Sequence, residues 1–155
     1  MKFDIYCAGT CRDEGEFAQV GACGYVLAMT DQRGIRLREF GFALGGSDTA
    51  LAEVQAVRLA LASIAPAYRT SVAVIHTTCP LVAETLSSDA DPSDPKTVRD
   101  LRRFFGFYPA AEVVLETEPS PYLVRARQLA KLGVETQKDF DSGTFDPKGG
   151  PNAKV

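Results

Sequence analysis

The sequence has no tryptophan, one histidine and two methionines, and no apolar run long enough to span a bilayer. Its first residues, Met1-Lys2-Phe3-Asp4, lack the long apolar region of a signal peptide. The four cysteines include no Cys-x-x-Cys pair, and reduced thiols fit them better than a disulfide framework. These absences predict a cytoplasmic protein with no membrane partner.

Excess positive charge is also missing. The net charge is -3 and the isoelectric point is about 5.2, so the whole chain does not attract nucleic acid, although a local basic patch still could. A length of 155 residues, with 45% hydrophobic and 24% charged residues, is typical of one globular domain. We expect that domain over residues 1–140. Residues 141–155, rich in glycine and poor in apolar residues, are expected to form a disordered tail.

Hydrophobic periodicity predicts nine elements in the order β-β-β-α-β-α-α-β-α. The expected strands are 3–8, 21–29, 35–44, 71–78 and 112–118, and the expected helices are 50–64, 80–87, 96–107 and 122–138. The polar stretch 12–19 is expected to be a loop, and 45–49 to cap the first helix. The helical crossover before 71–78 permits that strand to pair parallel to 3–8. The fold class is therefore α/β (α+β), with a five-stranded mixed sheet flanked by helices.

Five short motifs, taken in order, resemble the pattern of the ribonuclease H family. They are Ile5–Cys11 (IYCAGTC), Gly21–Leu27 (GACGYVL), Thr49–Ala56 (TALAEVQA), Val74–Val82 (VIHTTCPLV) and Arg125–Ala130 (RARQLA). The similarity covers residues 3 to about 132. It implies a ribonuclease H-like fold, of which this chain would be a divergent member.

Members of that family cleave the RNA strand of a hybrid with two Mg²⁺ ions held by four acids. The resemblance puts Ala8, Glu53, Thr78 and Arg127 at those four positions, so only Glu53 matches. We expect a degenerate active site with no cofactor and no metal, in a chain that is not an enzyme. A salt bridge between Glu53 and Arg127 is expected in place of the ions.

Other acids are weaker substitutes for the missing ones. Asp4 shares the face of Ala8, but four residues of strand separate them by about 13 Å. Asp13, Glu14 and Glu16 lie in the expected loop and are predicted to be ordinary surface acids.

Cys7, Cys11, His76 and Cys79 fall near the ends of the two central strands and form a minor candidate for a zinc site. His76 lies two residues before Thr78 and so could face the same pocket. Buried thiols are the favoured interpretation. A Cys79 nucleophile with His76 as its base is weaker still, because we expect the two side chains to point apart.

Arg99, Arg102 and Arg103 lie in the third expected helix beside Phe104, Phe105, Phe107 and Tyr108, and Arg125 begins the last motif. Basic residues among aromatic ones suit contacts with nucleic acid or a partner. The simpler interpretation, which we favour, is an amphipathic helix with its phenylalanines in the core.

The sequence thus favours a pseudoenzyme, a binding or scaffolding module with a protein partner, and it does not indicate an oligomeric state. The alternative is a non-cleaving binder of RNA or an RNA/DNA hybrid, which predicts one continuous basic surface over Arg99, Arg102, Arg103, Arg125 and Arg127. A second alternative is a residual metal-dependent nuclease.

Overall fold

The computed structural model describes residues 1–13, 19–45 and 49–143. Its elements, in chain order, are β1 (Lys2–Asp13), β2 (Gln19–Asp31), β3 (Gly34–Leu44), α1 (Thr49–Ser63), a 3₁₀ turn (Pro66–Tyr68), β4 (Val72–Thr77), α2 (Pro80–Ser87), α3 (Lys96–Gly106), β5 (Ala111–Leu115), α4 (Pro121–Thr136) and β6 (Phe140–Gly143).

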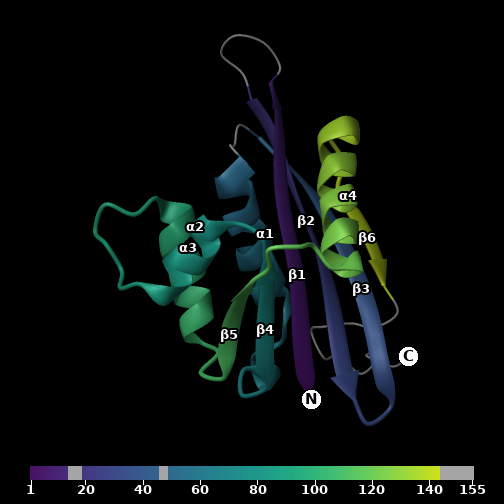
Figure 1. Ribbon diagram of the computed structural model, residues 1–155, viewed down its shortest axis with the longest axis vertical. Coiled ribbons are helices and arrows are strands. Elements are labelled where there is room, and N and C mark those ends of the chain that lie inside the picture. The colour runs from purple at the N-terminus through teal and green to yellow at the C-terminus, as the bar shows by residue number, and fades with distance from the viewer. Residues whose placement is uncertain (14–18, 46–48, 144–155) are drawn as a thin grey trace.

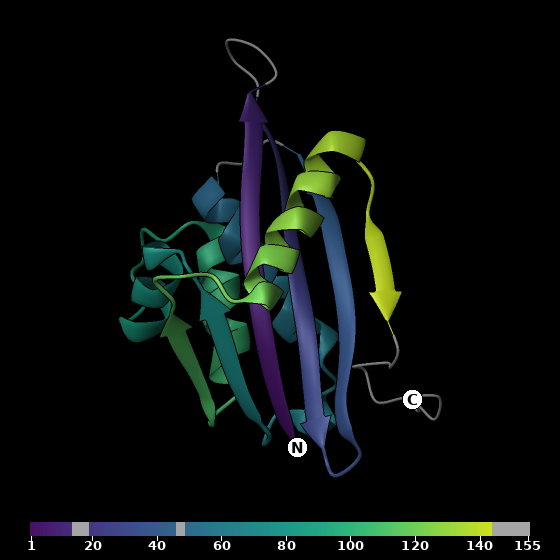
Figure 2. The ribbon, with the colours of Figure 1, turned by 45° about the vertical axis from the view of Figure 1, so that its right-hand side comes forward.

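The described strands form one mixed sheet in the order β5-β4-β1-β2-β3-β6. β1, β2 and β3 make an antiparallel meander, whereas β4 pairs parallel to β1 and β5 pairs parallel to β4. Figures 1 and 2 show the long meander in the middle of the molecule, with β4 and β5 on one side of it and β6 on the other. The parallel pairs follow from the helical crossovers that precede β4 and β5.

Alternation along β1 sends its side chains to two different layers. Phe3, Ile5 and Cys7 are fully buried in the larger core, which α1 and α3 complete. Tyr6 and Ala8 point to the opposite face and pack against α4. The sheet is therefore covered by α1, with α2 and α3 beside it, on one face and by α4 on the other (Figure 1).

The expected order of nine elements is confirmed, but two of the sequence predictions are wrong. The loop expected over 12–19 begins later, because Arg12 and Asp13 still pair with β2. The sheet also has a sixth strand, so a sheet of five strands and a tail beginning at residue 141 are both corrected. The cap expected at 45–49 and the tail beyond residue 143 lie partly or wholly outside the described residues.

Side chains at and just before the start of β6 anchor this strand to β3. The Arg38 guanidinium donates two hydrogen bonds to the Asp141 carboxylate, at 3.2 and 2.8 Å. Asp139 accepts a hydrogen bond from the Ala43 backbone N–H at 2.9 Å, and Phe140 packs against the smaller core. The four residues of β6 alternate only weakly between apolar and polar, so their sequence alone does not predict a strand. Long-range contacts with β3 hold them in the sheet instead.

No helix in the described part of the chain is long and apolar enough to cross a membrane.

Small residues let α4 lie close to the meander. A Cβ atom added at Gly24 would stand 2.6 Å from the Ala126 carbonyl oxygen and 2.8 Å from the Ala130 nitrogen. Both atoms belong to the helix backbone, which cannot move aside as a flexible side chain can. Glycine at position 24 therefore sets the distance between α4 and the sheet.

We expect Gly24→Ala to lower the free energy of unfolding by at least about 1–3 kcal/mol, because the added methyl group forces α4 away from β2. Urea denaturation followed by circular dichroism measures this change. Gly106→Ala is the matched control, since a Cβ atom there meets nothing within 4 Å. Equal stabilities of the two variants would contradict the close approach.

Candidate functional site

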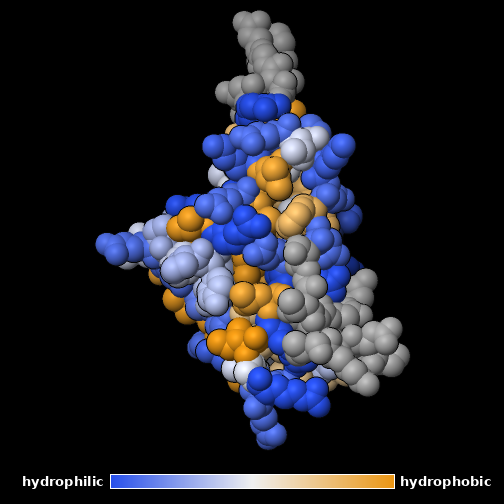
Figure 3. Space-filling model, turned by 90° about the vertical axis from the view of Figure 1, so that its right-hand side faces the viewer, coloured by the Kyte–Doolittle hydropathy of each residue, from blue (hydrophilic) through white to orange (hydrophobic). Residues whose placement is uncertain are grey.

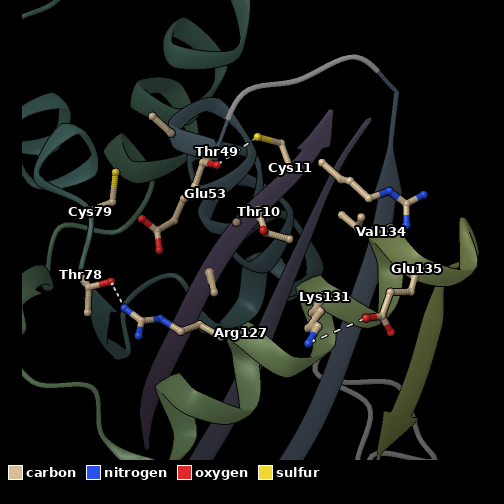
Figure 4. A pocket seen from close by; sticks show the side chains of 14 residues that line it. Thr10, Cys11, Thr49, Glu53, Thr78, Cys79, Arg127, Lys131, Val134 and Glu135 are labelled. Atoms are coloured by element: carbon tan, nitrogen blue, oxygen red, sulfur yellow. Dashed lines mark hydrogen bonds and ion pairs between the residues drawn. The ribbon is translucent and has the colours of Figure 1, made fainter. Parts of the chain in front are cut away.

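A pocket of about 780 Å³ lies beside the second half of β1 (Figure 4). β4 pairs with β1 only from Lys2 to Tyr6. In the described sheet, residues 8–12 of β1 thus have no strand neighbour on that side, and the pocket occupies this space. The start of α1, the residues after β4 and the second half of α4 form its other walls.

The four positions that the family resemblance singled out line this one pocket. Ala8 comes from β1, Glu53 from α1, Thr78 from the residue after β4 and Arg127 from α4. In Figure 4 the side chains of Glu53, Thr78 and Arg127 point toward the same space. The roles assigned to these residues remain predictions, but the structure brings their side chains together.

Gly9 allows α1 to approach β1 closely enough to place Glu53. A Cβ atom at Gly9 would overlap the Glu53 backbone nitrogen and stand 2.6 Å from the Ala52 carbonyl carbon. The first turns of α1 therefore lie directly on the strand, with the Glu53 side chain directed into the pocket.

Glu53 is only 7% exposed and is held by neutral donors. Burial raises the pKa of its carboxyl group, while hydrogen bonds from Cys79 and Thr77 and the charge of Arg127 offset part of that rise. Thr77 is itself oriented, because its hydroxyl oxygen accepts a hydrogen bond from the Cys79 backbone N–H at 3.0 Å. Burial likewise raises the pKa of the Cys79 thiol, so its neutral, hydrogen-bonding form is favoured.

The expected salt bridge between Glu53 and Arg127 is not formed. Arg127 Nη2 instead donates a hydrogen bond to Thr78 Oγ1 at 2.9 Å, and the side chain is exposed. Among the described residues no ion pair joins Arg127 to Glu53, although the guanidinium charge is felt at the carboxylate. The Glu53 carboxylate and the Arg127 guanidinium therefore face the same space without forming an ion pair.

Two further cations lie on the pocket wall. Arg12 comes from the end of β1, and Lys131 lies one turn after Arg127 on α4, with its ammonium 3.9 Å from Glu135. Among the described lining residues are three cations (Arg12, Arg127 and Lys131) and two carboxylates (Glu53 and Glu135). Cations are thus grouped at the described pocket wall of a chain whose net charge is -3.

The described residues do not fit a pair of magnesium ions. Magnesium takes oxygen ligands, and a two-metal site needs several carboxylates that converge. Glu53 and Glu135 are the only carboxylates of the described pocket lining, and Glu135 is paired with Lys131. Nowhere in the described ranges do three His, Cys, Asp or Glu side chains gather to hold a metal ion. Glu14 and Glu16 fall outside those ranges.

The minor zinc hypothesis is not supported, since its four residues have separate surroundings. Cys7 is buried in the larger core, and Cys11 Sγ lies 3.2 Å from Thr49 Oγ1. The Cys79 thiol forms a hydrogen bond with the Glu53 carboxylate, and His76 is not among the described residues that line the pocket. The same separation removes the hypothesis of a Cys79 nucleophile activated by His76.

His76 forms a polar cluster that the sequence did not reveal. Its Nε2 atom is 2.9 Å from Asp4 Oδ1, and its Nδ1 atom is 2.8 Å from Glu116 Oε1. The Tyr6 ring stacks on the imidazole at a centroid distance of 4.3 Å. The cluster joins β1, β4 and the segment between β5 and α4. Asp4 is thus a partner of His76, not a substitute for the acid missing at Ala8.

The arginines expected to contact nucleic acid or a partner do not line this pocket, and the structure divides them. Arg102 is a structural residue that donates hydrogen bonds to Asp94 and to two backbone carbonyl groups at the end of α2. Arg125 donates two hydrogen bonds to Glu39, at 2.8 and 3.0 Å. Arg99 and Arg103 are exposed on α3, which covers the opposite face of the sheet from α4. The expected continuous basic surface is therefore not formed.

The aromatic residues of α3 follow the simpler interpretation for the most part. Phe104 and Phe105 pack against the larger core, and the buried Tyr108 hydroxyl donates a hydrogen bond to the Leu61 carbonyl oxygen at 2.9 Å. Phe107 is 38% exposed and lies against Arg69, whose guanidinium is 4.2 Å from the ring centroid.

Comparison with known proteins gives matches among solved structures alone. No protein-family model and no curated protein sequence matches the chain. A structure of LC9-RNase H1 superposes with a TM-score of 0.70 at 11% identity, covering 92% of this chain and 77% of that one. RNase H1 from Halobacterium salinarum NRC-1 gives 0.68 at 22% identity, covering 89% and 100%. A foamy viral protease-reverse transcriptase in complex with RNA/DNA hybrid gives 0.68 at 17% identity, covering 86% and 20%.

The chain has a ribonuclease H-like fold. This confirms the fold that the five motifs implied. The expectation that the chain is not an enzyme is contradicted by the same comparison, because the structures that share the fold include ribonucleases H. The poor fit of the pocket residues to two magnesium ions therefore does not establish that the chain lacks an activity.

The raised pKa of Glu53 predicts a pH-dependent effect of Glu53→Gln. The folded chain binds this proton more tightly than the unfolded chain, so stability falls as pH rises from the unfolded pKa through the folded one. Glutamine removes the ionisation but keeps an oxygen that accepts from Thr77. We expect the variant to have a higher Tm than the parent at about pH 7.5 and a similar Tm at about pH 4, with about 2–4 °C for each kcal/mol recovered.

Differential scanning calorimetry at the two pH values tests this expectation. Glu84→Gln on α2 is the control, since Glu84 is exposed and its replacement should change little at either pH. A Tm difference for Glu53→Gln that is the same at both pH values would show that burial does not disfavour the Glu53 carboxylate.

Proposed function

We propose that this chain binds nucleic acid, RNA or an RNA/DNA hybrid, over the pocket beside β1. The observation that carries the proposal is the group of three cations, Arg12, Arg127 and Lys131, around a pocket on an otherwise acidic chain. Phosphate groups are ligands that grouped cations of this kind favour, because their binding releases counterions.

The shape and lining of the pocket support a nucleotide ligand. Thr10 and Thr49 add hydroxyl groups to the wall that holds Arg12. Hydroxyl groups and guanidinium groups are common partners of phosphate and sugar oxygens. A volume of about 780 Å³ gives the pocket room for a ligand larger than a single ion.

The shared fold supports the same class of ligand. The foamy viral structure that superposes at a TM-score of 0.68 is a complex with RNA/DNA hybrid. The likeness is to the fold, so the contacts proposed here come from this chain's own residues.

The protein-partner hypothesis has less support in the described surface. On the face shown in Figure 3, apolar side chains lie among hydrophilic ones. Val124 and Leu132 are the large apolar side chains of α4 that are exposed, at 41% and 38%. Single exposed side chains of this kind are common on monomeric proteins. A protein partner therefore remains a prediction from the sequence.

Cleavage of a phosphodiester bond is the second candidate function. It is favoured by the buried Glu53 carboxylate, whose pKa is raised and which faces the same space as the Arg127 guanidinium. A carboxylate with a raised pKa beside a phosphate-binding cation is a common arrangement in sites of acid–base catalysis.

We expect Arg127→Ala and Arg12→Ala each to weaken binding of a fluorescein-labelled RNA/DNA hybrid and to lower the salt slope by about 1, because each removes one phosphate contact. Fluorescence anisotropy of the full chain, measured over a salt series, gives both quantities.

Arg33→Ala is the matched control, since Arg33 is exposed in the β2–β3 turn at the far end of the sheet and its loss changes the net charge equally. If this control weakens binding as much as the pocket variants do, binding depends on overall charge and not on the pocket. Absence of salt-dependent binding by the parent chain would refute the proposed function.

A further inference from the structure

We propose that Glu53 and Arg127 form a metal-independent site that cleaves RNA by internal transesterification, with Glu53 as the general base and Arg127 as the phosphate-binding group. The inference rests on the proposed function, because it needs RNA to be bound in the pocket, and it names the substrate class and the reaction.

Glu53 has the surroundings that a general base requires. Its carboxylate is held by neutral donors, Thr77 and Cys79, and it is not consumed by an ion pair among the described residues. Burial raises its pKa from the ordinary carboxyl value toward the working pH, where a base accepts a proton more readily. The close contact of α1 with Gly9 fixes the backbone that carries it.

Arg127 has the surroundings that a phosphate-binding group requires. A guanidinium group has five N–H donors in a plane, and the hydrogen bond to Thr78 Oγ1 occupies one of its nitrogens. That bond holds the group on the side of the pocket toward which Glu53 points (Figure 4). The remaining donors can bind two phosphate oxygens in the bidentate manner that arginine favours.

A permanent cation can also do what a metal ion does for the transition state. Negative charge grows on the non-bridging oxygens of phosphorus as the nucleophile attacks, and donors already fixed in the site stabilise that charge. The described donor set does not fit two magnesium ions, whereas a guanidinium beside a carboxylate needs none.

The reaction balances with RNA alone. The Glu53 carboxylate takes the proton of the ribose 2′-hydroxyl, the 2′ oxygen forms a bond to the adjacent phosphorus, and the bond from phosphorus to the 5′ oxygen breaks. The leaving 5′ oxygen takes a proton from water, and Glu53 returns its proton to solvent. The products are a 2′,3′-cyclic phosphate and a 5′-hydroxyl end, and nothing is oxidised or reduced.

The reaction requires a ribose, so DNA and 2′-O-methyl RNA are bound but not cleaved. The test uses the full chain in EDTA with a DNA strand that contains one ribonucleotide, and a second strand in which that residue is 2′-O-methylated. Mass spectrometry identifies the new ends, and anisotropy measures binding of each strand in parallel. We expect cleavage of the first strand only, at the ribonucleotide, with a cyclic phosphate end.

Variants assign the roles. Glu53→Gln is expected to lower the cleavage rate by about 100-fold or more while binding persists, because a general base contributes a factor of at least that size. Arg127→Ala is expected to lose cleavage and weaken binding, Arg127→Lys to recover part of both, and Arg33→Ala to change neither. The parent's rate should rise with pH as Glu53 ionises, and this limb should disappear in Glu53→Gln.

Several outcomes overturn the inference. Cleavage that requires Mg²⁺ and leaves 3′-hydroxyl and 5′-phosphate ends indicates hydrolysis with a metal. Equal cleavage by the parent and Glu53→Gln preparations indicates another base or a contaminating ribonuclease. Binding of the ribonucleotide strand without cleavage rejects the inference but leaves the proposed function intact. Failure of the parent chain to bind the labelled RNA/DNA hybrid rejects both.

Discussion

Close contact between helix backbones and the central strands is the constraint on which the site depends. α1 lies on β1 at Gly9 from one face of the sheet, and α4 lies on β2 at Gly24 from the other. Because β4 ends early, the two helices reach the uncovered side of β1 from opposite faces. Glu53 and Arg127 line the same pocket there because neither helix is held away from the sheet by a side chain at Gly9 or Gly24. The same two contacts that pack the domain therefore set the geometry of the pocket.

The order of elements and the four positions around the pocket could be predicted because they depend on local pattern. Alternation, helical spacing and short motifs are properties of neighbouring residues. Features made by long-range pairing escaped prediction. The Asp4–His76–Glu116 cluster joins residues 72 and 40 positions apart, and β6 is held by the ion pair of Arg38 with Asp141, 103 positions away. No short window of sequence contains both members of such a pair.

The role of each arginine could not be predicted from the sequence either, because composition does not indicate which groups lie next to a charged side chain. Arg102 and Arg125 are committed to nearby acceptors, so they contribute to folding and not to a shared basic surface. Arg127, from the same motif as Arg125 but turned to another side of α4, faces the pocket. Arg125 and Arg127 are only two positions apart, but positions i and i+2 lie on different sides of a helix. One arginine is therefore part of a structural ion pair while the other faces the pocket.

The separation of Glu53 and Arg127 is the feature that a purely structural site does not explain. A buried carboxylate close to a guanidinium is stabilised when the two form a direct ion pair with good geometry. Here neutral donors hold the carboxylate and Thr78 holds the guanidinium, so both charges stay directed at the pocket. The free protein therefore lacks the stabilisation that a direct ion pair between Glu53 and Arg127 would give. A ligand that carries both a hydroxyl group and a phosphate can satisfy both side chains, since the hydroxyl can donate to Glu53 while the phosphate accepts from Arg127. Adjacent hydroxyl and phosphate groups are what each ribonucleotide of an RNA strand provides.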